Sequence, residues 1–295
     1  MRSTLTTLSP AKLNLFLHIT GRREDGYHNL QTVFQLLDYG DPMAFETPPA
    51  SRSNGLLALH TKGIVMPVDD NLILRAARLL REEAAKPDAS AVIRIHKRIP
   101  LGAGLGGGSS NAATTLLALN RLWRTGFSES RLCRLGRRLG ADVPVFVRSR
   151  SAWAEGVGDE LQPVELPESV YLVLNPSCGV STAEVFSHEQ LTRHSPAIRI
   201  ADFLAGWGSR HCFGQTANDC EPVVRALYPE VDEALRCLGR FAEARMTGTG
   251  SGVFARFDDE NAAQAVLAEL PGSMHGFIAR GVNRMNEVEI SDSRE

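Results

Sequence analysis

The sequence predicts a two-domain α+β protein, and three observations support this fold class. The chain has 295 residues, which suits two domains of about 100–200 residues each. Strand-like and helix-like periods of hydrophobic residues alternate along it, and its last part has a strand–helix–strand order. Hydrophobic residues make up 43% and charged residues 22%, a balance that permits a buried core and excludes a disordered or collagen-like chain.

Charge and cysteine content narrow the class of protein. Lys and Arg number 32 against 34 Asp and Glu, so the net charge is −2, which argues against a general binder of nucleic acid or anionic membranes. The five cysteines include no Cys-x-x-Cys pair and indicate neither a disulfide framework nor a zinc ribbon. The first ten residues lack the apolar core of a signal peptide, and no apolar run approaches the ~20 residues that span a bilayer. We expect a cytoplasmic protein with a small-molecule substrate and no nucleic-acid, membrane or obligate protein partner.

The first predicted element is a strand over residues 12–20. Leucine and isoleucine alternate there with Lys12, Asn14 and other residues, which is the period of a half-buried strand. This period places Lys12 and Asn14 on one face, opposite the leucines, at the start of the strand. Residues 21–28 follow as a loop, with Asp25-Gly26 as its turn signal.

A helix and a second strand come next. Asp70 or Asn71 can cap a helix that stops before Pro87, and residues 91–96 have the pattern of a strand.

The glycine-rich segment over residues 102–110 predicts a phosphate site. It runs directly into an apolar helical pattern over residues 111–123, which a flexible linker would not do. Glycines let the backbone approach a ligand closely, and the unpaired N–H groups of a helix N-terminus attract phosphate. The hydroxyls of Ser109 and Ser110 can cap the helix, contact phosphate or approach a cation.

Better-known phosphate loops differ from this segment. A Walker A loop requires a Gly-Lys pair, and a protein kinase requires His-Arg-Asp and Asp-Phe-Gly motifs, none of which the sequence contains. Gly102, Gly104 and Gly107 fit the dinucleotide pattern G-x-G-x-x-G. However, several residues separate them from the preceding strand, and no convincing acidic partner follows about 20 residues on. A Rossmann oxidoreductase therefore remains a distant alternative.

Two further segments are candidates for the site: the segment around Asp142 and a second cluster of glycines. Leucines at helical spacing end at Gly140, and Asp142 precedes an apolar stretch over residues 143–147 that we expect to be a strand. A second glycine cluster, residues 247–252, is either a tight turn before a strand or a second loop near phosphate.

The C-terminal part has a compact pattern of its own. Residues 170–174, 253–257 and 276–282 are predicted strands, and residues 261–270 are a predicted helix. Residues 191–215 have little pattern, and we expect irregular structure there.

Several segments together resemble the GHMP kinases, the galactose, homoserine, mevalonate and phosphomevalonate kinase superfamily. Residues 100–110 resemble the ATP-binding motif of that superfamily, and residues 245–252 resemble its third motif. Residues 9–15 with 25–28, and residues 140–146, resemble the opening and the catalytic segment of the branch that phosphorylates 4-diphosphocytidyl-2-C-methyl-D-erythritol.

The resemblance implies both a fold and a reaction. It implies a ribosomal protein S5 domain 2-like N-terminal domain over residues 1–163 and a ferredoxin-like C-terminal domain over residues 164–295, with the active site in the cleft between them. It also implies that ATP phosphorylates the 2-hydroxyl of 4-diphosphocytidyl-2-C-methylerythritol, giving the 2-phosphate and ADP, in the non-mevalonate route to isoprenoid precursors.

The resemblance assigns ATP and catalytic roles to particular residues. Asp142 is the base that takes the proton of the acceptor hydroxyl, and Lys12 holds that hydroxyl and offsets charge on the transferring group. Without the resemblance, Lys12 would be interpreted as a solvated strand residue and Asp142 as a turn residue. Mg²⁺ is expected to accompany ATP, held largely by nucleotide and water with Ser109 or Asp142 nearby. The expected ATP-binding residues are Pro100, Leu101, Gly102, Ala103, Gly104, Leu105, Gly106, Gly107, Gly108, Ser109 and Ser110, with Thr247, Gly248, Thr249 and Gly250 as a possible second loop.

The cytosine ring of the acceptor substrate is expected to bind among aromatic side chains. The resemblance puts His28 on the cytosine edge, and a histidine can both donate and accept hydrogen bonds. Asn14 is expected to reach a substrate hydroxyl and Thr182 to contact substrate. Tyr27, Phe34 and Phe186 are expected around the ring.

One departure and three alternatives remain. Ser149 stands where the resemblance leads us to expect glycine, and Ser151 and Trp153 add bulk nearby, which would alter the floor of the site. Lys97 and Arg98 either assist with phosphates or form a solvated turn.

The alternative functions are a homoserine- or mevalonate-type kinase, a nucleotide-binding protein without turnover, and the Rossmann oxidoreductase. The Tyr27-His28 segment argues against the first alternative, and Lys12 with Asp142 argues against the second.

Overall fold

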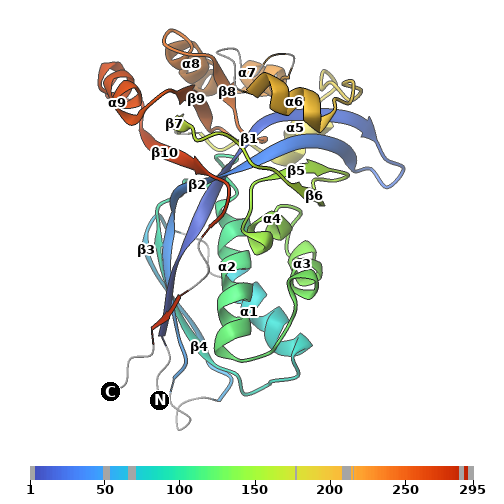
Figure 1. Cartoon of the computed structure of the whole chain (residues 1–295), viewed down its shortest axis with the longest axis vertical. Coiled ribbons are helices and arrows are strands. Elements are labelled where there is room, and N and C mark those ends of the chain that lie inside the picture. The colour runs from blue at the N-terminus through green and yellow to red at the C-terminus, as the bar shows by residue number, and fades with distance from the viewer. Residues whose placement is uncertain are drawn as a thin grey trace.

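The computed structural model describes residues 4–48, 54–65, 71–176, 178–207, 214, 216–285 and 289–291 (Figure 1). The N-terminal part contains β1 (Thr4–Arg22), β2 (His28–Glu46), β3 (Leu57–Gly63), α1 (Leu72–Glu83), β4 (Ala91–Lys97), α2 (Gly107–Leu122), α3 (Glu129–Arg137), α4 (Val143–Arg148), β5 (Ala152–Glu155) and β6 (Glu160–Pro163). The C-terminal part contains β7 (Val170–Leu174), α5 (Thr182–Ser187), α6 (Ile200–Trp207), α7 (Glu221–Leu227), α8 (Pro229–Leu238), β8 (Ala244–Met246), β9 (Val253–Phe257), α9 (Glu260–Glu269), β10 (Gly276–Val282) and β11 (Glu289–Ser291).

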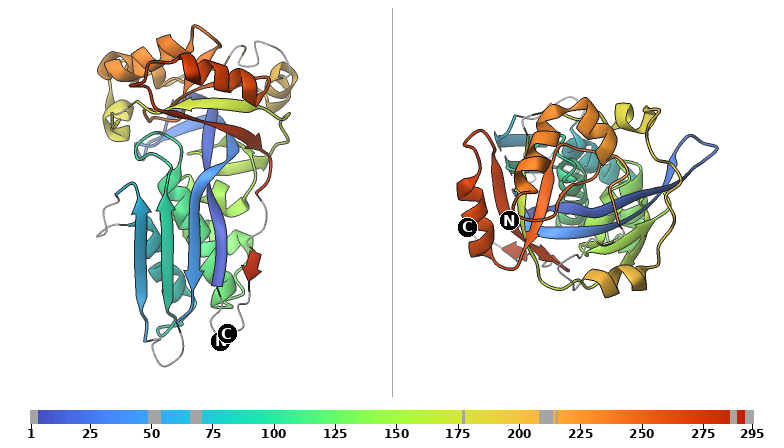
Figure 2. Two further views of the ribbon diagram at one scale, coloured as in Figure 1. Left: turned by 90° about the vertical axis from the view of Figure 1, so that its left-hand side faces the viewer. Right: turned by 90° about the horizontal axis from the view of Figure 1, so that it is seen from above.

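A long antiparallel ribbon of β1 and β2 runs through both parts of the molecule (Figure 2). In the lower part β2 also pairs with β4, and β3 adds to β4 in parallel. Helices α1 to α4 cover one face of this sheet (Figure 1). Asn71 caps α1 by accepting a hydrogen bond from the N–H of Ile73, as the sequence predicts, whereas Asp70 lies outside the described residues.

The C-terminal part has the predicted ferredoxin-like topology. Its strands lie in the order β10-β7-β9-β8 and all pair antiparallel, the order of a split β-α-β unit. Helices α7, α8 and α9 lie together above this sheet (Figure 1). None of the described helices combines the length and apolar character that crossing a bilayer requires.

One sheet joins the two parts. β10 pairs with β7 on one side and with the middle of β2 on the other, through Gly281 opposite Leu37 and Val282 opposite Leu36. β11 then pairs with the start of β1. The domain division after residue 163 falls between β6 and β7 and stays a prediction.

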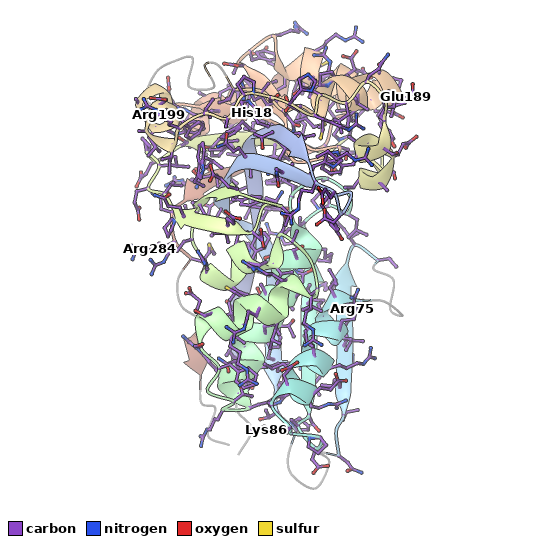
Figure 3. The ribbon with its side chains drawn as sticks, turned by 90° about the vertical axis from the view of Figure 1, so that its right-hand side faces the viewer. His18, Arg75, Lys86, Glu189, Arg199 and Arg284 are labelled. Carbon is purple, nitrogen blue, oxygen red and sulfur yellow. The ribbon has the colours of Figure 1, made fainter. Side chains whose placement is uncertain are left out.

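The strand predicted over residues 12–20 belongs to β1, but it is not half-buried. Lys12 and Asn14 are buried like the neighbouring Leu13 and Leu15, because the glycine-rich loops cover their face while apolar residues cover the other. His18, further along the same strand, is also enclosed among side chains (Figure 3). The prediction of a half-buried strand was therefore wrong, and the difference brings a lysine into a buried site.

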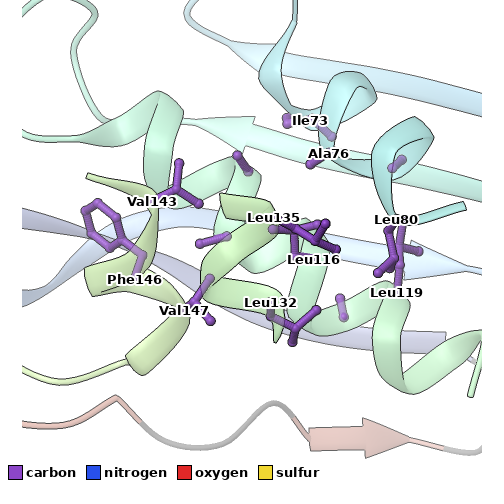
Figure 4. Close-up of a cluster of buried hydrophobic side chains, with 14 of the residues drawn as sticks. Ile73, Ala76, Leu80, Leu116, Leu119, Leu132, Leu135, Val143, Phe146 and Val147 are labelled. Atoms are coloured by element: carbon purple, nitrogen blue, oxygen red, sulfur yellow. The ribbon is translucent and has the colours of Figure 1, made fainter. Parts of the chain in front are cut away.

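The strand predicted over residues 143–147 is also wrong, because this segment forms helix α4. A short apolar run has no period that separates a strand from a buried helix. Pro144 suits the first turn of a helix, because backbone N–H groups there have no acceptor within the helix, and proline lacks only that group. Figure 4 shows Val143 and Val147 among leucines of α2 and α3, and every residue of α4 before Arg148 is buried.

Two smaller expectations also differ from the structure. Residues 191–215 are not wholly irregular, because α6 lies within them with Trp207 fully buried, while residues 208–213 and 215 lie outside the described residues. Helix α2 begins at Gly107, before the predicted residue 111, so the last glycines of the loop form its first turn.

Candidate active site

A cavity of about 790 Å³ lies between the glycine-rich loops, the β1–β2 ribbon and α5. It gathers most of the residues that the sequence predicts for the site, although they come from both parts of the chain. The predicted residues that line it are Lys12, Asn14, Tyr27, His28, Phe34, Gly102, Gly104, Gly106, Gly107, Gly108, Ser109, Asp142, Thr182, Phe186, Gly248 and Thr249.

The remaining predicted residues are not part of the cavity lining, and several have a visible supporting role. Ala103 and Leu105 are buried in the apolar core beneath the first loop. The hydroxyl of Ser110 is fully buried and hydrogen-bonded to Ser9 at 2.8 Å. The predicted residues outside the lining are Pro100, Leu101, Ala103, Leu105, Ser110, Thr247 and Gly250.

The first glycine loop presents a helix N-terminus to the cavity. Gly102, Gly104 and Gly106 have φ angles of +70°, +71° and +70°, in the left-handed region that glycine adopts without strain. Gly106 is the N-cap of α2 and provides no side-chain bond to the first N–H groups. Those groups, with the helix dipole behind them, form a site for an anion such as phosphate.

The second glycine loop packs directly against the first. The N–H groups of Ser251 and Gly252 donate to the carbonyls of Gly102 at 3.2 Å and Ala103 at 3.1 Å. A Cβ on Gly104 would lie 2.0 Å from the carbonyl oxygen of Thr247. The two loops therefore need glycine for close backbone contact, and only Gly248 and Thr249 of the second loop reach the cavity.

A lysine and a carboxylate face each other inside the cavity. The ammonium of Lys12 lies 3.5 Å from Oδ2 of Asp142 and donates to the carbonyl of Gly104 at 2.8 Å. Burial lowers the pKa of Lys12, and the charge of Asp142 acts in the opposite direction. Asp142 is the N-cap of α4 but makes no side-chain capping bond, so its carboxylate is available to a ligand.

Asn14 and Phe34 hold Lys12 in place. The side-chain oxygen of Asn14 accepts a hydrogen bond from Lys12, and its amide nitrogen donates to Thr32 at 2.9 Å. Phe34 lies beneath the ammonium, 5.4 Å from ring centroid to nitrogen, a cation–π distance. Both residues thus contact the lysine end of the cavity, whereas the sequence prediction places Phe34 around the cytosine ring.

The opposite end of the cavity is aromatic. The rings of His28 and Phe186 stack with centroids 5.1 Å apart and planes inclined by 25°. Tyr27 is 67% exposed beside them, at the tip of the β1–β2 ribbon. Thr182, at the start of α5, shares a 2.8 Å hydrogen bond with Thr249, which ties the aromatic end to the second glycine loop.

The other residues that the sequence analysis considered for the site, Lys97, Arg98 and Ser149, do not line the cavity. Lys97 is fully buried and forms an ion pair with Asp41 at 2.5 Å, so it is neither a phosphate contact nor part of a solvated turn. Arg98 lies over the ring of Tyr39. Ser149 is the C-cap of α4 with φ +52°, a left-handed position where glycine is preferred, and it does not line the cavity.

Sequence reasoning missed Arg193, which reaches the aromatic end. Its guanidinium contacts His28 and the backbone at the end of α5. The residue lies in the segment without a hydrophobic period, and a single arginine there carries no signal. Only the folded chain shows its position.

Fold and cavity together define a GHMP kinase, a class that phosphorylates small molecules. Residues 71–150 match the family model of the GHMP kinases N terminal domain, and residues 200–276 match that of the GHMP kinases C terminal. The Rossmann alternative is thereby wrong, because the sheet is largely antiparallel and the glycine loop belongs to this other class.

Curated relatives narrow the class further. The chain is 51% identical over 283 residues to 4-diphosphocytidyl-2-C-methyl-D-erythritol kinase of Marinobacter nauticus, covering 96% of each chain. It is 53% identical over 275 residues to the protein of the same name from Nitrosococcus oceani, covering 93% of this chain and 94% of that one. The chain belongs to the 4-diphosphocytidyl-2-C-methyl-D-erythritol kinase family.

Solved structures agree with this assignment. A crystal structure of 4-(cytidine 5'-diphospho)-2C-methyl-D-erythritol kinase superposes with a TM-score of 0.78 at 33% identity, covering 94% of this chain and 99% of that one. A homoserine kinase from Cytophaga hutchinsonii superposes with a TM-score of 0.70 at 15% identity, covering 98% and 97%. The latter likeness concerns the fold alone.

Proposed function

We propose that this chain transfers the γ-phosphate of ATP to the 2-hydroxyl of 4-diphosphocytidyl-2-C-methyl-D-erythritol, a step toward isoprenoid precursors. The observation that carries the proposal is a single cavity with three chemically distinct parts. A helix N-terminus suits the phosphates, a lysine–carboxylate pair suits an alcohol acceptor, and stacked rings suit a base.

The pair of Lys12 and Asp142 is assigned the transfer step. The acceptor oxygen forms a bond to the γ-phosphorus, the bond from that phosphorus to the β,γ-bridging oxygen breaks, and ADP leaves. The proton of the acceptor hydroxyl passes to the carboxylate of Asp142. Lys12 orients the hydroxyl and stabilises negative charge, since burial strengthens its field at short range.

The phosphates are assigned to the first turn of α2. Gly107, Gly108 and Ser109 begin the helix and line the cavity, so their N–H groups receive the negative oxygens. The second glycine loop keeps this turn in position through its close contact with Gly104.

Mg²⁺ is proposed to accompany ATP. The described residues contain no group of three His, Cys, Asp or Glu side chains placed for a metal. The cavity does offer the carboxylate of Asp142 and the hydroxyl of Ser109, which are hard oxygen donors and suffice for an ion that keeps phosphate and water ligands. When bound, the ion neutralises charge on the β- and γ-oxygens.

The test is ADP release with ATP and Mg²⁺ against a panel of acceptors. The panel holds 4-diphosphocytidyl-2-C-methyl-D-erythritol, mevalonate, homoserine and galactose, with a blank that lacks acceptor. Turnover on the cytidyl compound alone is expected, because only that acceptor has a base for the aromatic end. Turnover on another acceptor, or none with ATP still bound, would overturn the proposal.

A further inference from the structure

Arg193 connects the two rings at the aromatic end of the cavity. Its Nε–H donates to Nε2 of His28 at 3.3 Å. Its Nη2 donates to the carbonyls of Phe186 at 3.0 Å and His188 at 2.8 Å, and its Nη1 donates to the carbonyl of Leu191 at 3.1 Å. One planar guanidinium thus joins the first residue of β2 to the C-terminal end of α5, with donors directed at four acceptors.

The contact determines which nitrogen of His28 carries the proton. A guanidinium has only donors, so the Nε2 atom that it contacts must present a lone pair. In a neutral imidazole the proton is then on Nδ1. Among the described residues nothing bonds to Nδ1, which leaves an N–H for a ligand.

The charges around His28 favour this neutral form. Partial burial lowers the pKa of His28, and the positive charges of Arg193 and of Arg22 lower it further. Arg193 comes from the segment after α5 and Arg22 from the end of β1. A second proton on the ring would sit on Nε2, directly opposite the arginine N–H.

We propose that Arg193 is a positioning residue that locks His28 as a hydrogen-bond donor at Nδ1 and thereby makes the site select cytosine over uracil. This inference rests on the proposed function, because it requires a pyrimidine at the aromatic end. Cytosine has an acceptor at N3, whereas uracil has an N–H at the same position. A ring locked as a donor pairs with the first base and opposes the second.

Without Arg193 the selectivity should become dependent on pH. A free neutral imidazole exchanges its proton between the two nitrogens and can accept from uracil N3–H as readily as it donates to cytosine N3. Below its pKa, which burial and the charge of Arg22 still hold under the ordinary imidazole value, the ring gains a second proton, and both nitrogens donate again. The locked ring of the unaltered protein should instead be selective on both sides of that pKa.

The first test is direct and needs no turnover. Nitrogen chemical shifts of ¹⁵N-histidine distinguish a protonated from an unprotonated ring nitrogen, and the chain has eight histidines, so a His28→Gln variant assigns the signal. We expect a proton on Nδ1 of His28 at neutral pH, and a mixture of both tautomers in Arg193→Met. A proton on Nε2 in the unaltered protein overturns the proposal, whatever the substrate is.

The second test compares kcat/KM for the cytidyl substrate and its uridine counterpart between pH 5.5 and 8. In Arg193→Met we expect the cytosine preference to fall about tenfold or more at pH 8, since one unmatched hydrogen-bonding group costs about that factor. The preference should recover toward the acid end of this range, as the ring takes up its second proton. Arg193→Lys keeps a donor and should retain most of the preference.

The matched control is Arg199→Met, in the same segment. Arg199 pairs with Asp202 at 2.8 Å and lies at the outer edge of the upper half of the molecule (Figure 3), so the preference should not change. If Arg193 serves only to hold the end of α5, Arg193→Met will lower kcat/KM equally for both bases at every pH, which overturns the proposal. Absence of turnover with the cytidyl compound in the unaltered protein would instead overturn the proposed function, and the nitrogen shifts would still decide the role of Arg193.

Discussion

The ammonium of Lys12 lies 3.5 Å from the carboxylate of Asp142, and the two side chains differ in exposure, at 3% and 34%. Lys12 is enclosed by Asn14, Phe34 and the backbone of Gly104. Asp142 therefore presents the open side of the pair to the cavity. We therefore expect the carboxylate to be the group that contacts the acceptor, with the lysine beside it.

Replacing Asp142 by Asn should remove most turnover while leaving ATP binding largely intact. The amide keeps the shape of the side chain but cannot take a proton, and general-base catalysis contributes about 10²–10⁴-fold to rate. Steady-state ADP release and nucleotide titration measure the two quantities. The control is Asp202→Asn, because Asp202 pairs with the exposed Arg199 at the outer edge of the molecule (Figure 3) and does not line the cavity. An unchanged kcat in Asp142→Asn would show that Asp142 is not the base.

The same substitution should lower the pKa of Lys12 further. Burial lowers this pKa, and Asp142 opposes that effect by stabilising the ammonium; removing the carboxylate leaves burial unopposed. Lys12 should then lose its proton at a lower pH than in the unaltered protein. The chain has four lysines, so ¹³C NMR of lysine labelled at Cε can follow Lys12, with Lys12→Met as the assignment. A pKa that rises in Asp142→Asn would contradict this account of the pair.

Gly104→Ala should impair both folding stability and ATP binding, because its Cβ would lie 2.0 Å from a backbone oxygen of the second loop. Gly126→Ala is the matched control. Gly126 has φ +70°, close to the +71° of Gly104, but no heavy atom lies within 4 Å of its added Cβ. Both variants carry the backbone cost, so we expect an excess destabilisation of about 1–3 kcal/mol in Gly104→Ala from overpacking. Equal losses of stability in denaturant unfolding would mean that contact between the loops is unimportant.

Phe186→Leu should raise KM for the cytidyl substrate with little change in KM for ATP. Stacking of a base on an aromatic ring is worth about 1–3 kcal/mol, which corresponds to roughly 5–150-fold in KM if binding equilibrates. Phe277→Leu is the control, since Phe277 stacks on Tyr39 and does not line the cavity. A parallel rise in both KM values would place Phe186 elsewhere in the mechanism.

Ser149→Gly should stabilise the protein without changing its kinetics. Ser149 has φ +52° at the end of α4, where a side chain costs about 1 kcal/mol or more relative to glycine. The added freedom of glycine in the unfolded chain and the lost 3.1 Å bond from its hydroxyl to Phe146 offset part of the gain. We expect a net increase of about 0.5 kcal/mol in the free energy of unfolding. A changed kcat would mean that Ser149 does affect the floor of the site.

Much of the architecture follows from local patterns. The cap at Asn71, the glycine loop before α2 and the last strand–helix–strand unit are confirmed. These features depend on neighbours within a few residues, so the order of residue types is sufficient to predict them. The family resemblance rests on the same local segments and is confirmed by the relatives.

The tertiary structure decided what local patterns leave open. The apolar run over residues 143–147 is compatible with a buried strand and with a buried helix. Only packing against α2 and α3 selects the helix, which places Asp142 at the cavity. Lys12 has the alternation of a solvated strand, yet a loop from elsewhere in the chain buries it. No hydrophobic period or motif in the sequence marks Arg193 as a residue of the site. The sequence by itself determined the class of chemistry, because each motif is local. The burial, protonation and orientation of its groups depend on contacts between distant segments, which form only when the chain folds.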